Sequence, residues 1–481
     1  MTGEPEQAVV DPGSFRDPES RVLLGADAVY RVLSARGHSD WRALAESATF
    51  ARFTAAGSLI GTEECEEPAI PAAIARNGGG ESMLAAGVAG VLRHDRIPFV
   101  SYPYEWSFSM LRDAALLQLD LLLSALDDGL ILKDASPYNV QWRGARAVFV
   151  DIGSFERLRE GEPWAGYRQF CALFLNPLLL QAYRGIPFQP WLRGSIDGIA
   201  PADADRCFSL RDHFRRGVLT HVHVHARLER RNAARAGAEV KRELRDARFS
   251  SELIRANARR LRKLVARLEW DPGASTWSGY RDANTYTEAT ADRKAAFVAE
   301  ALRATSHGLV WDIGANDGAY SRIAAEAGAY VVAIDSDQAT IDALYRQLAS
   351  EGNERILPLV ADVTDPSPGL GWRGLERPPL EARGKPDLVL ALALVHHAAI
   401  GGNVPLAEIV GWMRSLDAAL VVEFPPREDE MVRSLLSGKD EGSNPDYDLE
   451  NFERLLAERF AIERREQLSE GGRVLYFARP A

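Results

Sequence analysis

Short apolar runs of strand length recur along the C-terminal part of the chain, and the first three each end in an acid. The first run ends at Asp312, the second spans 329–335 and the third spans 356–362. Helical stretches separate them, which is typical of parallel strands joined by crossover helices. The pattern therefore predicts an α/β fold with a doubly wound sheet. The remaining predicted strands are 386–392, 418–424, 460–464 and 473–478, the last two forming a hairpin.

The turn after the first strand has the form Gly-x-x-x-Gly, with Gly314 and Gly318 at its ends. Glycine permits a tight turn and lets the backbone approach a nucleotide-like ligand. Ala315 and Asn316 leave too few glycines for the pyrophosphate fingerprint of dinucleotide-binding folds, and Asp312 would repel a pyrophosphate. An acidic rim instead suits a ligand with a cationic amino-acid tail, such as S-adenosylmethionine.

Five strand–helix steps followed by a terminal hairpin resemble the class I S-adenosylmethionine-dependent methyltransferases over roughly residues 285–481. The resemblance implies a Rossmann-like sheet that binds S-adenosylmethionine or S-adenosylhomocysteine at its carboxyl edge, with Asp335 on the ribose hydroxyls and Asp362 beside the adenine. The alternative is a doubly wound domain with another cofactor, in which Asp312 caps a helix and Asp335 is a solvated turn acid. The cofactor-binding candidates are Asp312, Gly314, Ala315, Asn316, Gly318, Asp335 and Asp362.

Two histidines, His396 and His397, follow the fourth predicted strand, and Glu423 ends the fifth. Methyl transfer to a hydroxyl needs in-line alignment and removal of one proton, and a neutral imidazole near pH 7 is suited to accept that proton. We therefore take His396 or His397 as the first candidate base and Glu423 as the second. An ordinary imidazole pKa of about 6.5 predicts a rate that falls below that pH. The alternative for the histidine pair is a helix start that packs or caps locally.

A second candidate site lies in the N-terminal part, after a predicted helix at 108–126. Asp134 is followed five residues later by Asn139, and an apolar strand at 147–150 then runs into Asp151-x-Gly. This pattern resembles the catalytic loop and metal-binding turn of the protein-kinase and aminoglycoside-phosphotransferase folds. The resemblance implies that Asp134 would sit by the acceptor hydroxyl, while Asn139 and Asp151 would hold Mg²⁺.

The same region departs from that pattern where nucleotide phosphates would bind. No Gly-rich phosphate loop is visible near the N-terminus, and no lysine precedes Lys133 in the chain. Arg31, in an apolar run at 29–33, is the candidate for the missing strand cation, but a guanidinium cannot copy a compact ammonium. The sequence thus predicts an α+β kinase-like domain that does not phosphorylate. The alternative is a loop rich in Asp and Asn for its turn chemistry alone.

Between these two parts the chain becomes helical and charged, which predicts a helical connector. Within it, His221, His223 and His225 alternate with valine. On a strand they would share one face as a metal site, but no carboxylate or cysteine lies at the usual ligand spacing, so packing is favoured and no metal is expected. The predicted domains are 1–215 (kinase-like), 216–280 (connector) and 281–481 (methyltransferase).

Composition narrows the function classes further. The formal net charge is −11, so binding to nucleic acid is not expected. The three cysteines are far apart and odd in number, which argues against a disulfide framework. No apolar run reaches the length of a membrane span and the N-terminus has no apolar signal core, which predicts a cytoplasmic protein.

The order of kinase-like domain, helical connector and methyltransferase domain resembles a bacterial family of two-part proteins related to nodulation-type methyltransferases. It implies a methyltransferase acting on a small molecule or saccharide in a biosynthetic pathway, with a protein partner left open. One alternative is a bifunctional kinase–methyltransferase. Another is a methyltransferase-fold protein that keeps the cofactor but catalyses a different step, such as an intramolecular displacement or cyclisation. The resemblance is carried by 102–108, 132–141, 164–170 and 395–406.

Overall fold

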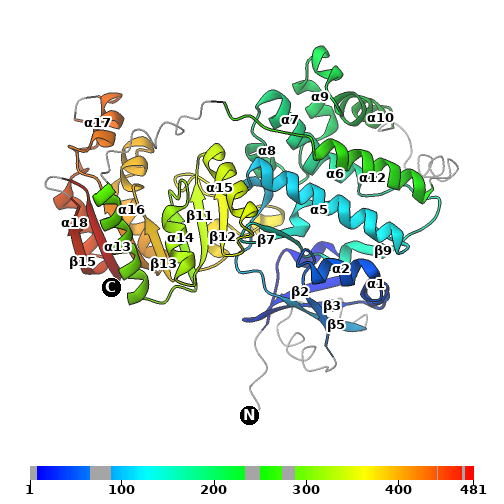
Figure 1. The fold of residues 1–481 in the computed structure, drawn as a ribbon, viewed down its shortest axis with the longest axis horizontal. Coiled ribbons are helices and arrows are strands. Elements are labelled where there is room, and N and C mark those ends of the chain that lie inside the picture. The colour runs from blue at the N-terminus through cyan, green and yellow to red at the C-terminus, as the bar shows by residue number, and fades with distance from the viewer. Residues whose placement is uncertain (1–7, 66–87, 233–249, 274–287, 441, 469–471) are drawn as a thin grey trace, which may run out of the picture.

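The structure is a computed structural model, and it describes residues 8–65, 88–232, 250–273, 288–440, 442–468 and 472–481 (Figure 1). The predicted boundary between residues 280 and 281 lies outside the described residues. The described chain forms an N-terminal region of a sheet and many helices, and a C-terminal region around a seven-stranded sheet. Figure 1 shows the C-terminal sheet at the left and the N-terminal region at the right.

The N-terminal region begins with an antiparallel five-stranded sheet of order β1-β2-β3-β5-β4. Its strands are β1 Val9–Val10, β2 Ser20–Leu24, β3 Ala28–Leu33, β4 Thr62–Glu64 and β5 Gly90–Asp95, with the 3₁₀ turn η1 Ser14–Arg16. Two helices, α1 Ala35–Ala45 and α2 Ala48–Ala55, start at Ser34 and Ser47, whose side chains accept backbone N–H groups of the first turn. Arg31 on β3 pairs in register with Val22 and Leu92 on the neighbouring strands.

A long apolar helix, α5 Phe108–Asp127, confirms the helix predicted at 108–126. Ser107 caps its start, and Gly129, with a φ of +70°, lets the chain turn after its end. Four short strands follow and pair as two antiparallel ribbons, β6 with β9 and β7 with β8. These elements are β6 Leu130–Leu132, η3 Pro137–Asn139, β7 Val140–Arg143, β8 Arg146–Phe149, η4 Ile152–Ser154 and β9 Phe155–Arg157.

The other helices of the N-terminal region are η2 Pro103–Glu105, α6 Tyr167–Phe170, η5 Cys171–Leu175, α7 Asn176–Arg184, α8 Gln189–Gly194, α9 Pro201–Cys207, η6 Leu210–Phe214, η7 Val218–Val224, α10 His225–Asn232 and α12 Ser251–Val265. Of these, α7, η5 and α12 pack against α5, and α9, η6, η7 and α10 pack on one another. Helix α12 packs along α5 and buries Ile254, Ala258 and Leu261, which recur at helical spacing. Helix α12, from the predicted connector, therefore packs against the N-terminal region.

The C-terminal sheet has the order β12-β11-β10-β13-β14-β16-β15, and β16 runs in the direction opposite to the other six strands. The strands are β10 Leu309–Ile313, β11 Tyr330–Asp335, β12 Ile356–Val360, β13 Leu388–Ala391, β14 Ala419–Phe424, β15 Phe460–Gln467 and β16 Val474–Pro480. This confirms the predicted doubly wound α/β sheet with a terminal hairpin. Its helices and turns are α13 Glu288–Ala304, α14 Ala319–Glu326, α15 Gln338–Ser350, η8 Trp372–Gly374, η9 Leu380–Ala382, η10 His397–Gly401, α16 Leu406–Ser415, α17 Glu430–Ser437 and α18 Leu449–Ala457.

The two regions are joined by buried polar contacts as well as by a shared hydrophobic core. Arg383 of the C-terminal region forms an ion pair with Glu105, and the two side chains are only 1% and 0% exposed. Asp342 on α15 accepts hydrogen bonds from the Ser109 N–H at 2.7 Å and from its hydroxyl at 3.1 Å. Charged groups buried in this way hold a single relative placement, since separating them would leave them without partners.

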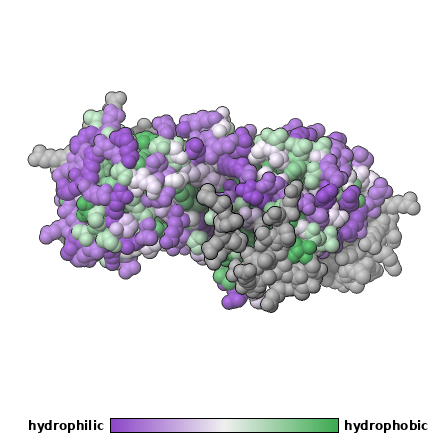
Figure 2. Space-filling view, turned by 90° about the horizontal axis from the view of Figure 1, so that it is seen from below, coloured by the Kyte–Doolittle hydropathy of each residue, from purple (hydrophilic) through white to green (hydrophobic). Residues whose placement is uncertain are grey.

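On the face that Figure 2 presents, hydrophilic residues predominate among the coloured residues, and hydrophobic ones are scattered among them. Across the described residues, no helix is both long enough and apolar enough to traverse a membrane.

Candidate functional site

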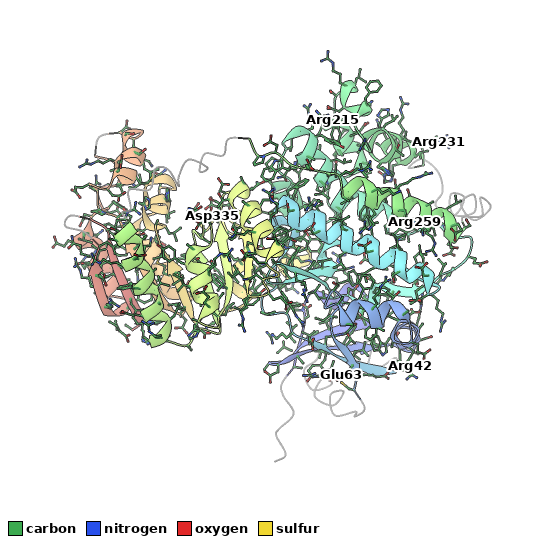
Figure 3. All side chains as sticks on the ribbon, viewed as in Figure 1. Arg42, Glu63, Arg215, Arg231, Arg259 and Asp335 are labelled. Carbon is green, nitrogen blue, oxygen red and sulfur yellow. The ribbon has the colours of Figure 1, made fainter. Side chains whose placement is uncertain are left out.

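Three acids lie along one edge of the C-terminal sheet, at the carboxyl ends of neighbouring parallel strands. Asp312 is the penultimate residue of β10, Asp335 is the last residue of β11, and Asp362 follows the end of β12. The Ala361 N–H donates to the Asp335 carbonyl at 3.0 Å, which keeps the ends of β11 and β12 together. Figure 3 marks Asp335 on the C-terminal sheet. Ligands of doubly wound sheets bind at this edge.

The glycine turn after β10 wraps back onto the end of β11. Gly314 has a φ of +77°, a conformation that favours glycine. The N–H groups of Gly314 and Ala315 donate to the Ile334 carbonyl at 2.8 and 3.0 Å. Asn316, with a φ of +48°, then donates its N–H to Asp335 Oδ2 at 3.0 Å. The turn therefore sits directly against the acid that the sequence assigned to a ribose.

Gly318 serves helix packing in addition to the turn. It has a φ of +77° and immediately precedes α14. A Cβ atom at this position would lie 2.8 Å from Leu344 Cδ1 on α15. The sequence interpretation assigned Gly318 to close approach of a ligand, whereas the described contact is between the start of α14 and the middle of α15.

Asp312 is buried and held by a neutral donor. Its side chain is 1% exposed, and Ser321 donates its hydroxyl to Asp312 Oδ2 at 2.6 Å. Burial raises the pKa of Asp312 to about 6, and the Ser321 bond and the charge of Lys294 only partly oppose that rise. The carboxyl is therefore mostly anionic at pH 7 in dry surroundings, where a cationic ligand group would be bound strongly.

The other two acids accept backbone and hydroxyl hydrogen bonds while keeping further lone pairs. Asp335 Oδ1 accepts the Asp337 N–H at 2.9 Å, and burial raises the pKa of Asp335. Asp362 Oδ1 accepts from the Thr364 N–H at 2.8 Å and from its hydroxyl at 2.7 Å. Both carboxylates are thus oriented by neutral groups of the turns that follow their strands.

A buried charged cluster lies at the ends of β13 and β14, and sequence reasoning found only one of its members. Glu423 is 0% exposed, and its Oε2 accepts from Lys294 Nζ at 2.9 Å and from the Ala393 N–H at 2.7 Å. Arg473 Nη1 lies 3.7 Å from the same oxygen. Burial lowers the pKa of Lys294, although Glu423 opposes the change. Lys294 and Arg473 belong to no sequence motif, so no local signal could have identified them.

The two histidines lie next to this cluster with ring centroids 4.1 Å apart. His396 is 0% exposed, and neither ring nitrogen has a hydrogen-bond partner among the described residues. Burial, and then His397, Arg473 and Lys294, hold the pKa of His396 well below 6.5. Burial and Arg473 lower the pKa of His397 to about 4. Both imidazoles are therefore neutral at pH 7, and His397 becomes protonated only near its pKa of about 4, instead of near the ordinary value of 6.5 used in the sequence prediction.

The residues of the N-terminal candidate site also come together, but they bind one another. Arg31 Nη2 lies 3.0 Å from Asp151 Oδ1, and Ser154 donates its hydroxyl to Asp151 Oδ2 at 2.5 Å. Asn139 Nδ2 donates to the Ser154 hydroxyl at 3.0 Å. Burial and the nearby Asp151 raise the pKa of Asp134. The carboxylate predicted to hold Mg²⁺ thus already faces a guanidinium.

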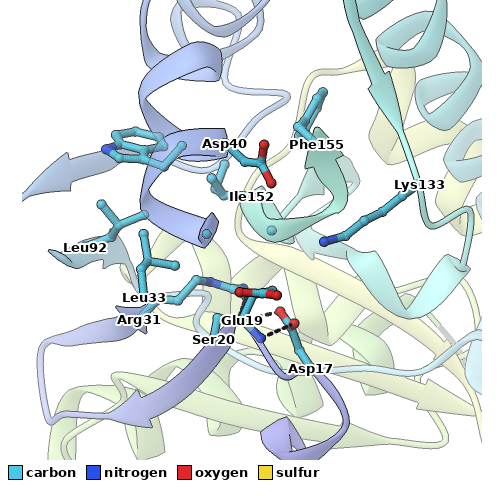
Figure 4. Close-up of a pocket in the computed structure, with 13 residues that line it drawn as sticks. Asp17, Glu19, Ser20, Arg31, Leu33, Asp40, Leu92, Lys133, Ile152 and Phe155 are labelled. Carbon is cyan, nitrogen blue, oxygen red and sulfur yellow. Dashed lines mark hydrogen bonds between the residues drawn. The ribbon is translucent and has the colours of Figure 1, made fainter. Parts of the chain in front are cut away.

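A pocket opens beside this group, between β3, α1 and the turn η4 (Figure 4). Figure 4 shows Lys133 reaching into it toward Arg31 and Asp17. Asp17 accepts the Glu19 N–H at 2.9 Å and the Ser20 hydroxyl at 2.6 Å. The pocket therefore carries two cations and several acids, so its charges largely neutralise each other.

The alternating histidines do not form a strand. They lie in η7, a π-helical turn, and at the start of α10, so the strand geometry considered from the sequence is wrong. His221 Nδ1 lies 2.9 Å from the Tyr167 hydroxyl, and the ring of His225 lies 5.2 Å from that of Tyr167. His223 Nδ1 lies 2.8 Å from Asp205 Oδ1. Valine favours strands locally, but packing of this segment against α6 and α9 decides its conformation.

Comparison with known proteins shows a relative that matches nearly the whole chain. No family model matches. The chain is 34% identical over 466 residues to the nodulation protein NoeA of Rhizobium meliloti strain 1021, covering 96% of this chain and 94% of that protein.

Solved structures show weaker and partial likenesses. Magnesium protoporphyrin IX methyltransferase (ChlM) of Synechocystis PCC 6803, with bound S-adenosylhomocysteine, is 19% identical, covers 43% of this chain and 94% of its own, and has a TM-score of 0.30. The N-methyltransferase NodS of Bradyrhizobium japonicum WM9 is 13% identical, with 40% and 98% coverage and a TM-score of 0.30. WbdD is 18% identical, with 46% coverage of each chain and a TM-score of 0.29.

Proposed function

Because the chain belongs to the family of the nodulation protein NoeA, we propose that it is an S-adenosylmethionine-dependent methyltransferase acting on a small molecule or saccharide. One observation carries the proposal: Asp312, Asp335 and Asp362 end neighbouring parallel strands beside the turn at Gly314. The insertion of antiparallel β16 between β14 and β15 adds support, since the resemblance to class I methyltransferases implied a terminal hairpin.

S-adenosylmethionine is the cofactor, and the edge of the sheet matches its chemical parts. Asp312, which is buried and anionic at pH 7, forms an ion pair with the ammonium group of the amino-acid tail. Asp335 is oriented by two backbone N–H groups and has lone pairs left for the ribose hydroxyls. Asp362 lies next in order, beside the adenine. When bound, the cofactor supplies a methyl group already activated by its sulfonium.

The acceptor proton is removed by His397. This imidazole is neutral at pH 7, is partly buried, and lies beside the ends of β13 and β14, where the acceptor would approach. His396, in ring contact with it, is a positioning residue. Glu423 is engaged by Lys294 and by the Ala393 N–H, so its carboxylate anchors the loop after β13 in preference to serving as a base.

The N-terminal region acts as a kinase-like scaffold that does not transfer phosphate and helps to hold the acceptor. The Arg31–Asp151 ion pair supports the absence of phosphate transfer, because it puts a positive charge where a Mg²⁺ ion would need an unpaired carboxylate. The buried contacts to the C-terminal region keep this scaffold next to the methyltransferase sheet. The Arg31–Asp151 ion pair favours the methyltransferase over the bifunctional kinase–methyltransferase.

Substitution of Asp335 tests the assignment of the cofactor. Asp335→Ala should weaken binding of S-adenosylhomocysteine by roughly 2–3 kcal/mol, because it removes charge-assisted hydrogen bonds to the ribose. Isothermal titration calorimetry measures the change. Asp337→Asn is the matched control, since it alters an acid two residues away while an amide oxygen can still cap α15. Equal affinities for Asp335→Ala and the unaltered protein would remove Asp335 from the site.

Methyl transfer is tested with S-adenosylmethionine labelled in its methyl group and with extracts that contain small molecules and saccharides. The label should appear in a low-molecular-weight product, and the Asp335→Ala protein should form less of it at limiting cofactor. If the cofactor binds and stabilises the fold but no methylated product forms with any acceptor, the chain uses the methyltransferase fold for another step.

A further inference from the structure

Three potential metal ligands meet in the N-terminal region, far along the chain from the methyltransferase sheet. Asp205 lies on α9, His213 on η6 and His223 on η7. Each offers one ligand atom, and the three atoms lie within 4.8 Å of one another. His223 Nδ1 and His213 Nε2 lie 2.8 and 3.9 Å from the same Asp205 oxygen, Oδ1. The two imidazole rings are 4.3 Å apart, centroid to centroid.

These separations suit a small tetrahedral ion. Bonds of about 2.0–2.1 Å to Zn²⁺ put the ligand atoms roughly 3.3 Å from one another, and the observed values of 2.8 and 3.9 Å lie on either side. A change of about half an ångström in each of these two separations would match that geometry, and the two imidazole nitrogens lie within 4.8 Å of each other. Within the described residues, no fourth His, Cys, Asp or Glu joins the group, so one position would be left for water or another small ligand.

The types of ligand atom in this group indicate which metal ion it would bind. Two imidazoles and one carboxylate are typical of Zn²⁺ and its late first-row neighbours, whereas Mg²⁺ and Ca²⁺ prefer oxygen ligands throughout. Arg230 donates to the second oxygen of Asp205, Oδ2, at 3.0 Å. A hydrogen bond of this kind orients a ligating carboxylate and leaves the other oxygen facing the metal.

We infer that Asp205, His213 and His223 form a binding site for one Zn²⁺ ion, which cross-links α9, η6 and η7. The local packing explains why a cross-link would help. Leu210 and Phe214 of η6 are 82% and 93% exposed, and the only buried residue of η6 is the polar Asp212. This turn has little apolar burial to hold it, so metal ligation would supply the missing anchor.

The site is tested with Co²⁺, which replaces Zn²⁺ and absorbs visible light strongly when four-coordinate. The full-length protein, without a polyhistidine tag and stripped with a chelator, is titrated with Co²⁺ and followed by absorbance. We expect one tightly bound ion per chain with four-coordinate bands, displaced by one equivalent of Zn²⁺. His213→Gln and His223→Gln should each remove the bands. His38→Gln is the matched control, since His38 also pairs with a carboxylate, Glu64, at 2.7 Å but belongs to no three-residue group among the described residues.

Thermal unfolding gives a second readout that does not depend on the spectrum or on activity. Zn²⁺ should raise the melting temperature of the unaltered protein and of His38→Gln by several degrees, because it binds the folded state, and should leave both site variants unchanged. Absence of stoichiometric Co²⁺ binding to the unaltered protein would overturn the inference even if a site variant failed to fold. Binding that survives in both site variants would place the ion elsewhere, for example on His396 and His397.

Discussion

The two candidate sites contain the same local feature, an acid after an apolar strand, and differ in what faces that acid. In the C-terminal sheet, Asp312 and Asp335 accept from a hydroxyl and from backbone N–H groups, which orient the carboxylates without neutralising them. In the N-terminal region, Asp151 faces the guanidinium of Arg31 at 3.0 Å. The acids of the proposed cofactor site thus keep their negative charge, whereas Asp151 is already ion-paired within the protein.

The contrast shows that the partner of an acid, more than its position after a strand, indicates whether the acid binds a ligand. Neutral donors orient a carboxylate and leave its charge available to an ammonium or a metal. A buried guanidinium satisfies that charge and adds a cation that repels Mg²⁺. The four expectations below test this difference, from the largest effect to the smallest.

Loss of the proposed base should have the largest effect. His397→Ala should lower turnover by roughly 10²–10⁴-fold while the affinity for S-adenosylhomocysteine stays nearly constant. Because the pKa of His397 is lowered to about 4, the rate of the unaltered enzyme at saturating cofactor should stay level from pH 8 to near pH 5 and fall only below that. Steady-state kinetics across this range checks both statements. Full turnover in His397→Ala, or a fall centred near pH 6.5, would move the base to another residue.

Breaking the buried link between the regions should have the next largest effect. Arg383→Ala leaves Glu105 buried without its ion-pair partner, a loss of about 3–5 kcal/mol. Thermal unfolding should show a lower melting temperature, and limited proteolysis should release the two regions more readily. Arg193→Ala is the control, because Arg193 pairs with the exposed Asp365 across the same junction and should change little. Equal shifts for both variants would mean that the buried pair does not hold the regions together.

The affinity for the cofactor product should depend on pH through Asp312. The pKa of this carboxyl is raised to about 6 by burial, so it is anionic above that pH and neutral below it. An ammonium ligand pairs with the anion, so binding below pH 6 must displace a proton, and the affinity for S-adenosylhomocysteine should fall by about tenfold from pH 7.5 to pH 5. Calorimetry at the two pH values measures this. Asp312→Asn should bind weakly at both, and a pH dependence that persists in this variant would assign it to another group.

Substitution of Asp151, beside the N-terminal pocket, should have the smallest effect. Because Asp151 is ion-paired with Arg31, ATP with Mg²⁺ should bind weakly or not at all. Asp151→Ala should therefore change neither nucleotide binding nor methyl transfer. Titration of the unaltered protein with ATP and Mg²⁺ checks the first part, and methyl-transfer assays check the second. Robust ATP turnover that Asp151→Ala abolishes would make the chain a bifunctional kinase–methyltransferase.

Elements with strong local periodicity were predictable, and those held by distant partners were not. The apolar runs before Asp312 and Asp335 became strands, and the helix predicted at 108–126 is α5. For the histidine run of η7, the sequence left the element open between a strand and a helix end, because valine at alternate positions favours strands, and packing decides it as a helical turn. The charges of the predicted connector indicated an exposed face, and the sequence did not show that the apolar face of α12 packs on α5.

By itself, the sequence determined the α/β class of the C-terminal region and the acids at its strand ends, since strand periodicity and strand-terminal residues are local properties. Only the tertiary structure decided which charges those acids face. Lys294 reaches Glu423, Arg31 reaches Asp151, and Asp205 meets His223. Such pairs join residues from separate elements, and no spacing rule along the chain encodes a contact that depends on how those elements pack.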